Sequence, residues 1–389
     1  MAERDVIVVG AGPGGAATAA DLAQRGYDVL LLDRQAFPRD KTCGDAVPAG
    51  AIETLWRLGA KEKVATAVQR GEFYELTGML LVSPRGYELQ ASFHPGKQGG
   101  HSYVAPRFFF DAVVQQQAVA NGATFAVAQV KAPVMENGRV VGVRARQNGQ
   151  EVEFRAKVVV GADGVTSAIS RALRPENQRH QDKHRAVALR AYIDDIEELP
   201  GLVEFYLYKD ILPGYAWIFP IGSNRANIGL GMRLDHFRKK KHSLEEMLHQ
   251  FLAMPAIKKR LKQGGELRDI ATWQLNFGSQ QGIPHTFDGA LLVGDAAGFI
   301  NPLTGGGIHN SLISAELAAQ TIDEALKRGD VSRQSLLIYE QRCHDAMWES
   351  MKTSYLYQRS FMRFPFLVDI LVKLFSENSG LAQTFLTKL

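Results

Sequence analysis

The chain has 389 residues, of which 46% are hydrophobic and 22% are charged, as in a globular protein of two domains or one elaborated domain. Its 45 Lys and Arg against 41 Asp and Glu leave a net charge of +4, and no basic stripe interleaved with aromatic residues indicates a nucleic-acid partner. Its only two cysteines, Cys43 and Cys343, argue against a disulfide scaffold and favour the reducing cytoplasm. The sequence has no cluster of Cys and His at ligand spacing, so no metal site is predicted.

The first predicted element is a β-α-β unit. Asp5–Val9 is a β-branched run, Gly14–Gln24 an alanine-rich helix, and Asp28–Leu32 a second apolar strand. The turn GAGPGG matches G-x-G-x-x-G, a pattern whose glycines let a pyrophosphate approach the backbone at the start of a helix. A carboxylate at the end of the second strand accepts hydrogen bonds from a ribose. The unit predicts a dinucleotide site at Gly10, Gly12, Pro13, Gly14, Gly15, Asp33 and the adjacent Arg34.

Helical and strand-like patterns alternate in the next part of the chain. Residues 51–70 and 107–120 have helical patterns, whereas 72–104 alternate polar and apolar residues and contain several Gly and Pro, as expected of an inserted sheet. Residues 123–160 predict two or three strands, with a hairpin turn at Asn137-Gly138.

Strand-like segments dominate from 184 to 232, and helical segments follow at 243–264. Two basic runs, 238–241 and 258–260, have helical spacing. We expect solvated helix faces there, with anionic lipid or a nucleotide phosphate as the alternative partners.

Two later strand ends carry further nucleotide motifs. The apolar strand Val158–Gly161 ends on Ala162-Asp163-Gly164, and residues 290–293 end on Gly294-Asp295. The glycine loop 305–307 then leads into a helix that reaches about residue 327. Backbone N–H groups of the loop and of the start of this helix would face the flavin N1–C2=O region. Three such motifs in this order favour FAD over NAD. The later motifs add to the predicted cofactor site Asp163, Gly164, Gly294, Asp295, Pro302, Gly305, Gly306, Gly307 and Ile308.

The positions of these motifs predict the fold class. They lie at 1–44, 158–171 and 290–320, with sheet-rich segments between them. We therefore expect an α/β (α+β) chain with a discontinuous Rossmann-like FAD-binding domain, an inserted antiparallel-sheet substrate domain and a helical C-terminal segment. The predicted boundaries are 1–75, 101–180 and 270–330 for the FAD-binding domain, 76–100 and 181–269 for the substrate domain, and 331–389 for the C-terminal region.

Over residues 1–330 the chain resembles the FAD-dependent oxidoreductases of the para-hydroxybenzoate-hydroxylase type, which include aromatic hydroxylases, flavin halogenases and geranylgeranyl reductases. The resemblance implies that Arg107 reaches the FAD pyrophosphate or ribityl chain; a surface arginine is the alternative. Such enzymes lack a second dinucleotide fold, and no second G-x-G-x-x-G follows a strand here. An external reductant such as NADPH or ferredoxin is therefore expected.

Two segments resemble the geranylgeranyl reductases in particular. FPRDKTCGDAVP, residues 37–48, is similar to their F-P-R-x-K-x-C-G-[GD] stretch, and residues 213–220 with 227–229 are similar to Y-x-W-x-F-P…V-G, with Ile228 in place of Val. Halogenases instead carry W-x-W-x-I-P, and Tyr215 stands where their first Trp would be. The resemblance implies hydride transfer from reduced flavin to a C=C bond of an isoprenoid lipid or another hydrophobic substrate, followed by protonation.

The resemblance also implies which side chains act. Tyr215, Trp217 and Phe219 alternate along a strand and would form an aromatic wall for the substrate, with ordinary core as the alternative. Cys43 would line the cavity as the proton donor or help to position it, and its alternative is a small buried apolar residue. We therefore expect catalytic roles for Cys43, Tyr215 and Trp217, and cofactor contacts from Cys43, Gly44 and Asp45.

The C-terminal segment contains PFLVDILVKLFSE, residues 365–377, a helix with a wide apolar face. This face either packs on the protein or meets a membrane surface or lipid substrate. No apolar run approaches the about 18 residues of a membrane span, and MAERDVIVVGAG lacks the pattern of a signal peptide. Two other functions stay open: a flavin-dependent monooxygenase or halogenase, and a non-catalytic prenyl-binding escort. The oligomeric state is not predicted.

Overall fold

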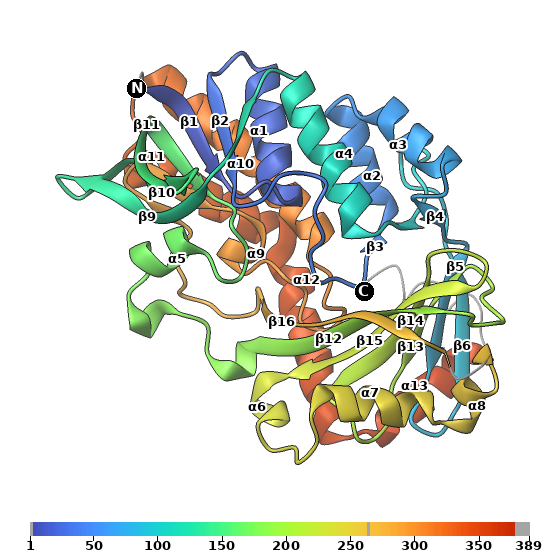
Figure 1. The fold of residues 1–389 in the computed structure, drawn as a ribbon. Coiled ribbons are helices and arrows are strands. Elements are labelled where there is room, and N and C mark those ends of the chain that lie inside the picture. Colours follow the sequence, from blue (N-terminus) through green and yellow to red (C-terminus); the bar gives the residue numbers. More distant parts are fainter. Residues whose placement is uncertain (1–2, 263–264, 378–389) are drawn as a thin grey trace.

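The structure, a computed structural model, describes residues 3–262 and 265–377 (Figure 1). The last part of the predicted helical regions, 263–264 and 378–389, lies outside the described residues. Two sheets form the molecule (Figure 1), one in the upper half with helices packed against it and one in the lower half, and α12 (Ile338–Arg363) runs from one half to the other.

The upper sheet has the order β17-β18-β11-β1-β2-β8, and β9 and β10 extend it from β11. Its centre is parallel: β1 pairs with β11 and β2, β2 with β8, and β11 with β18. All of β2 and the last four residues of both β1 and β11 are buried, as their apolar sequences require. The bounds are β1 Arg4–Val9, β2 Val29–Asp33, β8 Thr124–Val127, β9 Gln129–Glu136, β10 Arg139–Gln147, β11 Gln150–Gly161, β17 Thr286–Phe287 and β18 Ala290–Leu292.

Helix α1 packs against α4 and α10 beside this sheet. The predicted helix at 107–120 is confirmed, whereas the one predicted at 51–70 is two helices divided at Gly59, whose φ of 94° ends the first. The Asn137-Gly138 turn is also confirmed, with φ of 49° and 81° as a type I′ hairpin requires. The helix bounds are α1 Pro13–Gln24, α2 Ala49–Arg57, α3 Lys61–Gln69, α4 Arg107–Ala120, α5 Ala168–Leu173, α9 Gly294–Ala297 and α10 Ile308–Arg328.

The lower sheet has the order β16-β12-β15-β14-β13-β5-β6 and is antiparallel except for the parallel pair β13 and β5. This sheet joins residues 78–92 to strands that begin about a hundred residues later in the chain. Its edge strand β16 was not predicted from the sequence. A small sheet, β3-β7-β4, lies apart from it. The bounds are β3 Ala46–Val47, β4 Tyr74–Glu75, β5 Gly78–Val82, β6 Glu88–Ser92, β7 Tyr103–Val104, β12 Arg185–Asp194, β13 Leu202–Tyr206, β14 Gly214–Pro220, β15 Arg225–Arg233 and β16 Leu267–Asn276.

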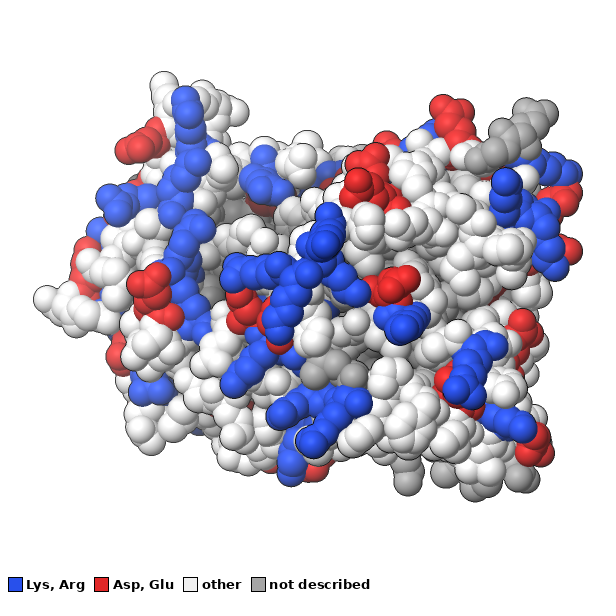
Figure 2. Space-filling view, turned by 90° about the horizontal axis from the view of Figure 1, so that it is seen from below, with Lys and Arg blue, Asp and Glu red and all other residues white. Residues whose placement is uncertain are grey.

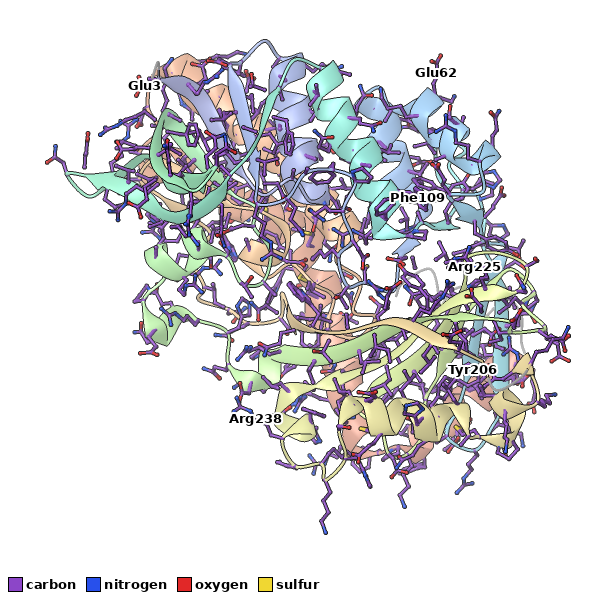
Figure 3. All side chains as sticks on the ribbon, viewed as in Figure 1. Glu3, Glu62, Phe109, Tyr206, Arg225 and Arg238 are labelled. Atoms are coloured by element: carbon purple, nitrogen blue, oxygen red, sulfur yellow. The ribbon has the colours of Figure 1, made fainter. Side chains whose placement is uncertain are left out.

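Short helices lie between β15 and β16 in the chain: α6 (Leu234–Phe237), α7 (Leu244–Leu252) and α8 (Pro255–Lys258). Tyr206, labelled in Figure 3, packs against Phe251 of α7 with 5.2 Å between ring centroids. Arg238 is exposed, as predicted for the first basic run. For Arg260 the prediction of a solvated face is wrong, because its guanidinium is buried in an ion pair with Glu204, 2.7 Å from Nη1 to Oε2. Glu204 of β13 is buried, and a buried carboxylate requires a nearby cation to compensate for its lost hydration.

The chain then continues through α11 (Arg333–Leu336) and α12 to α13 (Phe366–Ser376), which packs on β6. Among the described residues no helix is both long enough and apolar enough to cross a bilayer.

Candidate active site

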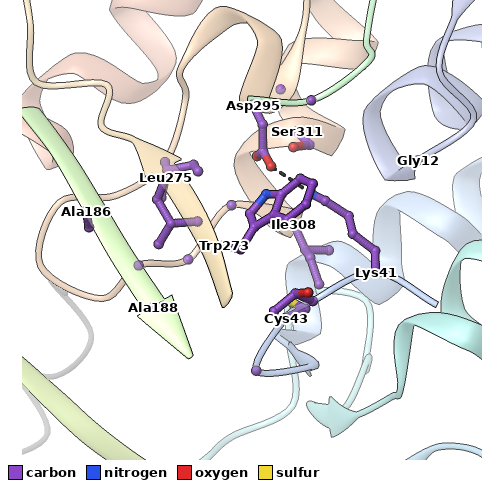
Figure 4. A pocket seen from close by; sticks show the side chains of 18 of the residues that line it. Gly12, Lys41, Cys43, Ala186, Ala188, Trp273, Leu275, Asp295, Ile308 and Ser311 are labelled. Carbon is purple, nitrogen blue, oxygen red and sulfur yellow. Dashed lines mark hydrogen bonds and ion pairs between the residues drawn. The ribbon is translucent and has the colours of Figure 1, made fainter. Parts of the chain in front are cut away.

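A cavity of about 800 Å³ has lining residues from both sheets, from α10 and from α12. Figure 4 shows part of it, with Ala186, Ala188 and Leu275 of the lower sheet facing Gly12 and Asp295 of the upper half. All of the predicted site residues except Gly15 line this cavity. Tertiary folding therefore places the three nucleotide motifs and the two reductase-like segments around one space.

The glycines of the GAGPGG turn differ in what surrounds them. A Cβ on Gly15 would lie 1.8 Å from the carbonyl oxygen of Gly10, so that glycine lets the helix pack against the strand. A Cβ on Gly12 would meet nothing closer than the guanidinium ends of Arg39 and Arg107, each at 3.8 Å. The backbone at Gly12 is thus open toward the cavity and toward two cations, as a pyrophosphate site requires.

Buried charges surround this turn. Asp33 accepts from the backbone N–H of Ala11 at 2.9 Å and from Arg39 at 3.3 Å. Arg107 is 3% exposed and donates to both carboxylate oxygens of Asp111, at 2.5 and 2.7 Å, and Arg39 donates to the same carboxylate at 2.9 Å. The surface alternative for Arg107 is therefore wrong. From the sequence, Arg39 was expected to meet either phosphate or solvent and was not counted among the site residues, and Asp111 was not predicted at all.

The two later motifs add acceptors. Asp163 Oδ2 accepts from the N–H of Ala168 at 2.6 Å, whereas its buried Oδ1 has no hydrogen-bond partner within the described residues. Asp295 accepts from Lys41 Nζ at 2.9 Å. Burial opposes ionisation of Asp295, but Lys41 and Arg107 outweigh it and hold the pKa of that carboxyl below its usual value.

These residues fit FAD. The open glycine at the start of α1 and the nearby guanidinium groups suit a pyrophosphate. The unpartnered Oδ1 of Asp163 is an acceptor that a ligand hydroxyl would satisfy. The Gly305–Gly307 loop lies at the start of α10 and lines the same cavity.

The predicted aromatic wall lies on one face of β14, which confirms the alternation. Ring centroids of Tyr215 and Trp217 are 6.0 Å apart, those of Trp217 and Phe219 are 6.1 Å apart, and Phe205 of the next strand packs edge-on to Tyr215. The Tyr215 hydroxyl donates to the carbonyl oxygen of Thr304, so the wall touches the glycine loop. The rings line the cavity and are more than sheet core.

Asn227 of β15 links the wall to the cysteine loop. Its side chain is buried, accepts from Trp217 Nε1 at 2.8 Å, and donates to the carbonyl oxygen of Cys43 at 2.8 Å and to Asp45 Oδ2 at 2.7 Å. Gly44 allows the cysteine loop to lie close to the wall, because a Cβ at this residue would lie only 3.1 Å from the Phe219 ring. Sequence reasoning noted Asn227 within a motif and assigned it no role, since its partners are far away in the chain.

Asn227→Leu is expected to keep FAD bound and to lower kcat about 10- to 100-fold, because loss of three hydrogen bonds lets the cysteine loop and Trp217 shift against each other. Flavin absorbance and steady-state kinetics measure the two effects. Asn224→Leu, on the exposed turn before the same strand, is the control. An unchanged kcat in Asn227→Leu would show that the link does not position the site.

Cys43 borders the cavity, and its Sγ accepts from the N–H of Asp45 at 3.3 Å. Enclosure by protein atoms raises the pKa of the thiol, and the nearby Arg107 only partly opposes this effect. The thiol is therefore protonated at neutral pH, and Cys43 lines the same cavity as the aromatic wall.

Asp45 is fully buried, accepts from the Tyr192 hydroxyl at 2.7 Å, and has φ of 65°, a conformation that Asp and Asn tolerate. Burial raises the pKa of its carboxyl from 3.8 to about 6, against the hydrogen bonds from Tyr192 and Asn227. Between pH 3.8 and about 6 the Asp45 carboxyl is therefore mostly protonated in the folded state and mostly ionised in the unfolded state.

The contribution of Asp45 to stability is consequently full below pH 3.8 and falls as the pH rises through about 6. We expect the difference in unfolding free energy between wild type and Asp45→Asn, both FAD-loaded, to fall over this window and then to stay constant. Urea unfolding at pH 4, 5, 6 and 7 measures it. A difference that rises or stays level over the window would contradict the raised pKa.

Comparison with known proteins agrees with this geometry. Residues 3–354 match the family described as FAD binding domain. A digeranylgeranylglycerophospholipid reductase of Methanocella arvoryzae is 33% identical over 358 residues, covering 91% of this chain and 86% of that protein. The protein of the same name from Thermoplasma acidophilum is 31% identical over 352 residues, covering 88% and 83%.

Two solved structures extend the comparison. A geranylgeranyl bacteriochlorophyll reductase-like protein from Thermoplasma acidophilum has a TM-score of 0.85 at 28% identity, covering 97% of this chain and 92% of its own. A myxobacterial chondrochloren halogenase has a TM-score of 0.73 at 26% identity, covering 88% and 80%. The reductase-like structure is therefore the better match in both coverage and shape.

Proposed function

Because the chain belongs to the geranylgeranyl reductase family of FAD-dependent oxidoreductases, we propose that it saturates carbon–carbon double bonds in the prenyl chain of a lipid. The observation that carries this proposal is the joint position of the cysteine loop and the Tyr215–Trp217–Phe219 wall, which line the cavity of the FAD motifs. An external donor such as NADPH or ferredoxin is expected to supply the electrons.

The residues have separable roles in this reaction. Reduced FAD, held by the glycine turn at Gly12 and by Arg39 and Arg107, would supply the hydride chemistry for one carbon of the double bond. The aromatic wall holds the flat alkene by apolar contact, and the protonated Cys43 thiol holds a proton for the other carbon. The rings of the wall are buried or, at Tyr215, half-buried, so the wall presents an apolar surface to this part of the cavity. Arg39 and Arg107 bind the cofactor and take no part in the chemical step.

The cavity also suits a long apolar substrate. Besides the wall, the lining includes Leu207 and Leu212 of the loop between β13 and β14, Phe361 of α12 and Val368 of α13. An aliphatic chain gains transfer free energy along such a lining, about 0.8 kcal/mol per buried CH₂ group. A prenyl chain with several isoprene units therefore fits better than a small polar substrate.

The test is single-turnover reduction under anaerobic conditions. The FAD-loaded protein is reduced with dithionite, mixed with geranylgeranyl lipids or menaquinone, and the products are analysed by mass spectrometry. A mass increase of two hydrogens per saturated bond is expected, with flavin reoxidation at the same rate. No mass change with any prenyl lipid would overturn the proposal. Oxygen-dependent hydroxylation or halogenation of a substrate would instead assign the monooxygenase or halogenase alternative.

A cytoplasmic location with peripheral membrane contact is part of the same proposal, because a prenyl lipid resides in a bilayer. The exposed face of α13 supports it.

A further inference from the structure

The two sides of α13 differ. On the inner side Val368 and Val372 are 2% exposed and pack with Leu89 of β6. On the same side Asp369 accepts from Ser83 Oγ at 2.8 Å and from the N–H of Arg85 at 2.9 Å. The helix is therefore fixed to the lower sheet by a packed and hydrogen-bonded face.

Its outer side is apolar and exposed. Phe366, Ile370 and Leu374 are 52%, 54% and 46% exposed and recur every four residues, so they form one stripe along the helix. Phe364, at the turn before α13, is 42% exposed, and Leu356 near the end of α12 is 53% exposed. The predicted apolar face thus divides into a packed half and an exposed half.

Within the segment that carries this stripe the exposed charges are basic, while Glu88 of the neighbouring β6 is an exposed acid beside it. From Met351 to Ser376 the exposed charged side chains are Lys352, Arg359, Arg363 and Lys373, and the single acid, Asp369, is buried. Glu349 and Glu377 flank the segment. Figure 1 places α13 with α6, α7 and α8 at the lower end of the molecule, and Figure 2 shows Lys and Arg, with several Asp and Glu among them, in the middle of the face at this end. An apolar stripe in a segment whose own exposed charges are all basic complements an anionic lipid surface.

The same corner borders the cavity from inside. Phe361 of α12 and Val368 of α13 are lining residues, although the stripe on the outer side is not. From this juxtaposition we propose that the end of α12 and α13 dock on an anionic bilayer, and that the prenyl chain enters the cavity past Phe361 and Val368. The entry step rests on the proposed function, whereas the docking does not.

Vesicle sedimentation of the FAD-loaded protein tests docking without any turnover. The vesicles are phosphatidylcholine alone and its mixture with phosphatidylglycerol. We expect binding to the anionic mixture, weakening with salt, and an at least tenfold weaker binding of the Phe366→Ser/Ile370→Ser/Leu374→Ser variant. Arg359→Glu/Arg363→Glu should lose only the anionic preference.

The control replaces three exposed apolar residues of the upper half, Val119→Ser/Val127→Ser/Met135→Ser, whose side chains are 44%, 42% and 47% exposed. It should sediment like wild type. Docking is overturned if wild type binds no vesicle, or if the α13 variant and the control bind equally. A wild-type dimer that the α13 substitutions make monomeric, without vesicle binding, assigns the stripe to a second copy and also overturns it.

Entry is tested by comparing a prenyl lipid embedded in vesicles with the same lipid dispersed in detergent. The α13 variant should be slower than wild type by at least tenfold on the embedded lipid and equal to it on the dispersed one. Equal rates on both overturn entry through this corner. If wild type reduces neither, the proposed function fails, and the sedimentation result still decides docking.

Discussion

Gly12→Val is expected to give a folded protein that no longer binds FAD. Apart from its neighbours in the chain, no protein atom lies closer than 3.8 Å to the position of a Cβ at this residue, so the fold accepts a side chain there. The same side chain fills the place where the pyrophosphate meets the backbone and two arginines. We expect affinity for FAD to fall at least about a thousandfold, equivalent to about 4 kcal/mol, and prenyl reduction to disappear.

Flavin absorbance per mole of purified protein measures this effect, and thermal unfolding shows whether the fold persists. Wild type stripped of FAD is the reference and should unfold at the same temperature as Gly12→Val. Gly15→Val is the contrasting variant: its Cβ would overlap the carbonyl oxygen of Gly10 at 1.8 Å, so it should fail to fold. A yellow Gly12→Val protein would refute the placement of the pyrophosphate.

Cys43→Ala is expected to retain FAD and to lower the rate of prenyl reduction about 10²- to 10⁴-fold, the range for loss of a positioned proton donor. The rate is read from flavin reoxidation by the prenyl substrate. Reoxidation by oxygen in the same protein needs no proton at the alkene carbon and should change little. This contrast separates the role of the thiol from a general disturbance of the site.

Cys343→Ala is the matched control, because Cys343 is the second thiol of the chain and is 3% exposed within α12, outside the cavity lining. It should keep wild-type turnover and lose only some stability. If Cys43→Ala also turns over at the wild-type rate, the sulfur has no part in proton transfer, and the segment acts through the shape of its loop.

The sequence by itself determined the cofactor motifs and much of the local structure. A glycine turn between strand and helix, an acid at a strand end and an alternating aromatic strand each depend on neighbours in the chain. The helix at 107–120, the Asn137-Gly138 turn and the one-sided wall of β14 could therefore be predicted. The reductase family followed from the resemblance of two segments, residues 37–48 and 213–220 with 227–229, to motifs of the geranylgeranyl reductases.

Other features were decided by the tertiary structure alone. GAGPGG does not show which glycine faces a ligand, because the difference between Gly12 and Gly15 is made by the atoms that pack around each. Asn227 acts through Cys43 and Asp45, more than 180 residues away. The sequence marked the apolar face of α13 but not its division, since Asp369 turns inward to Ser83 while Ile370 stays outside. Such contacts form between segments far apart in the chain, where burial and hydrogen-bond geometry, not local pattern, determine which side chains meet.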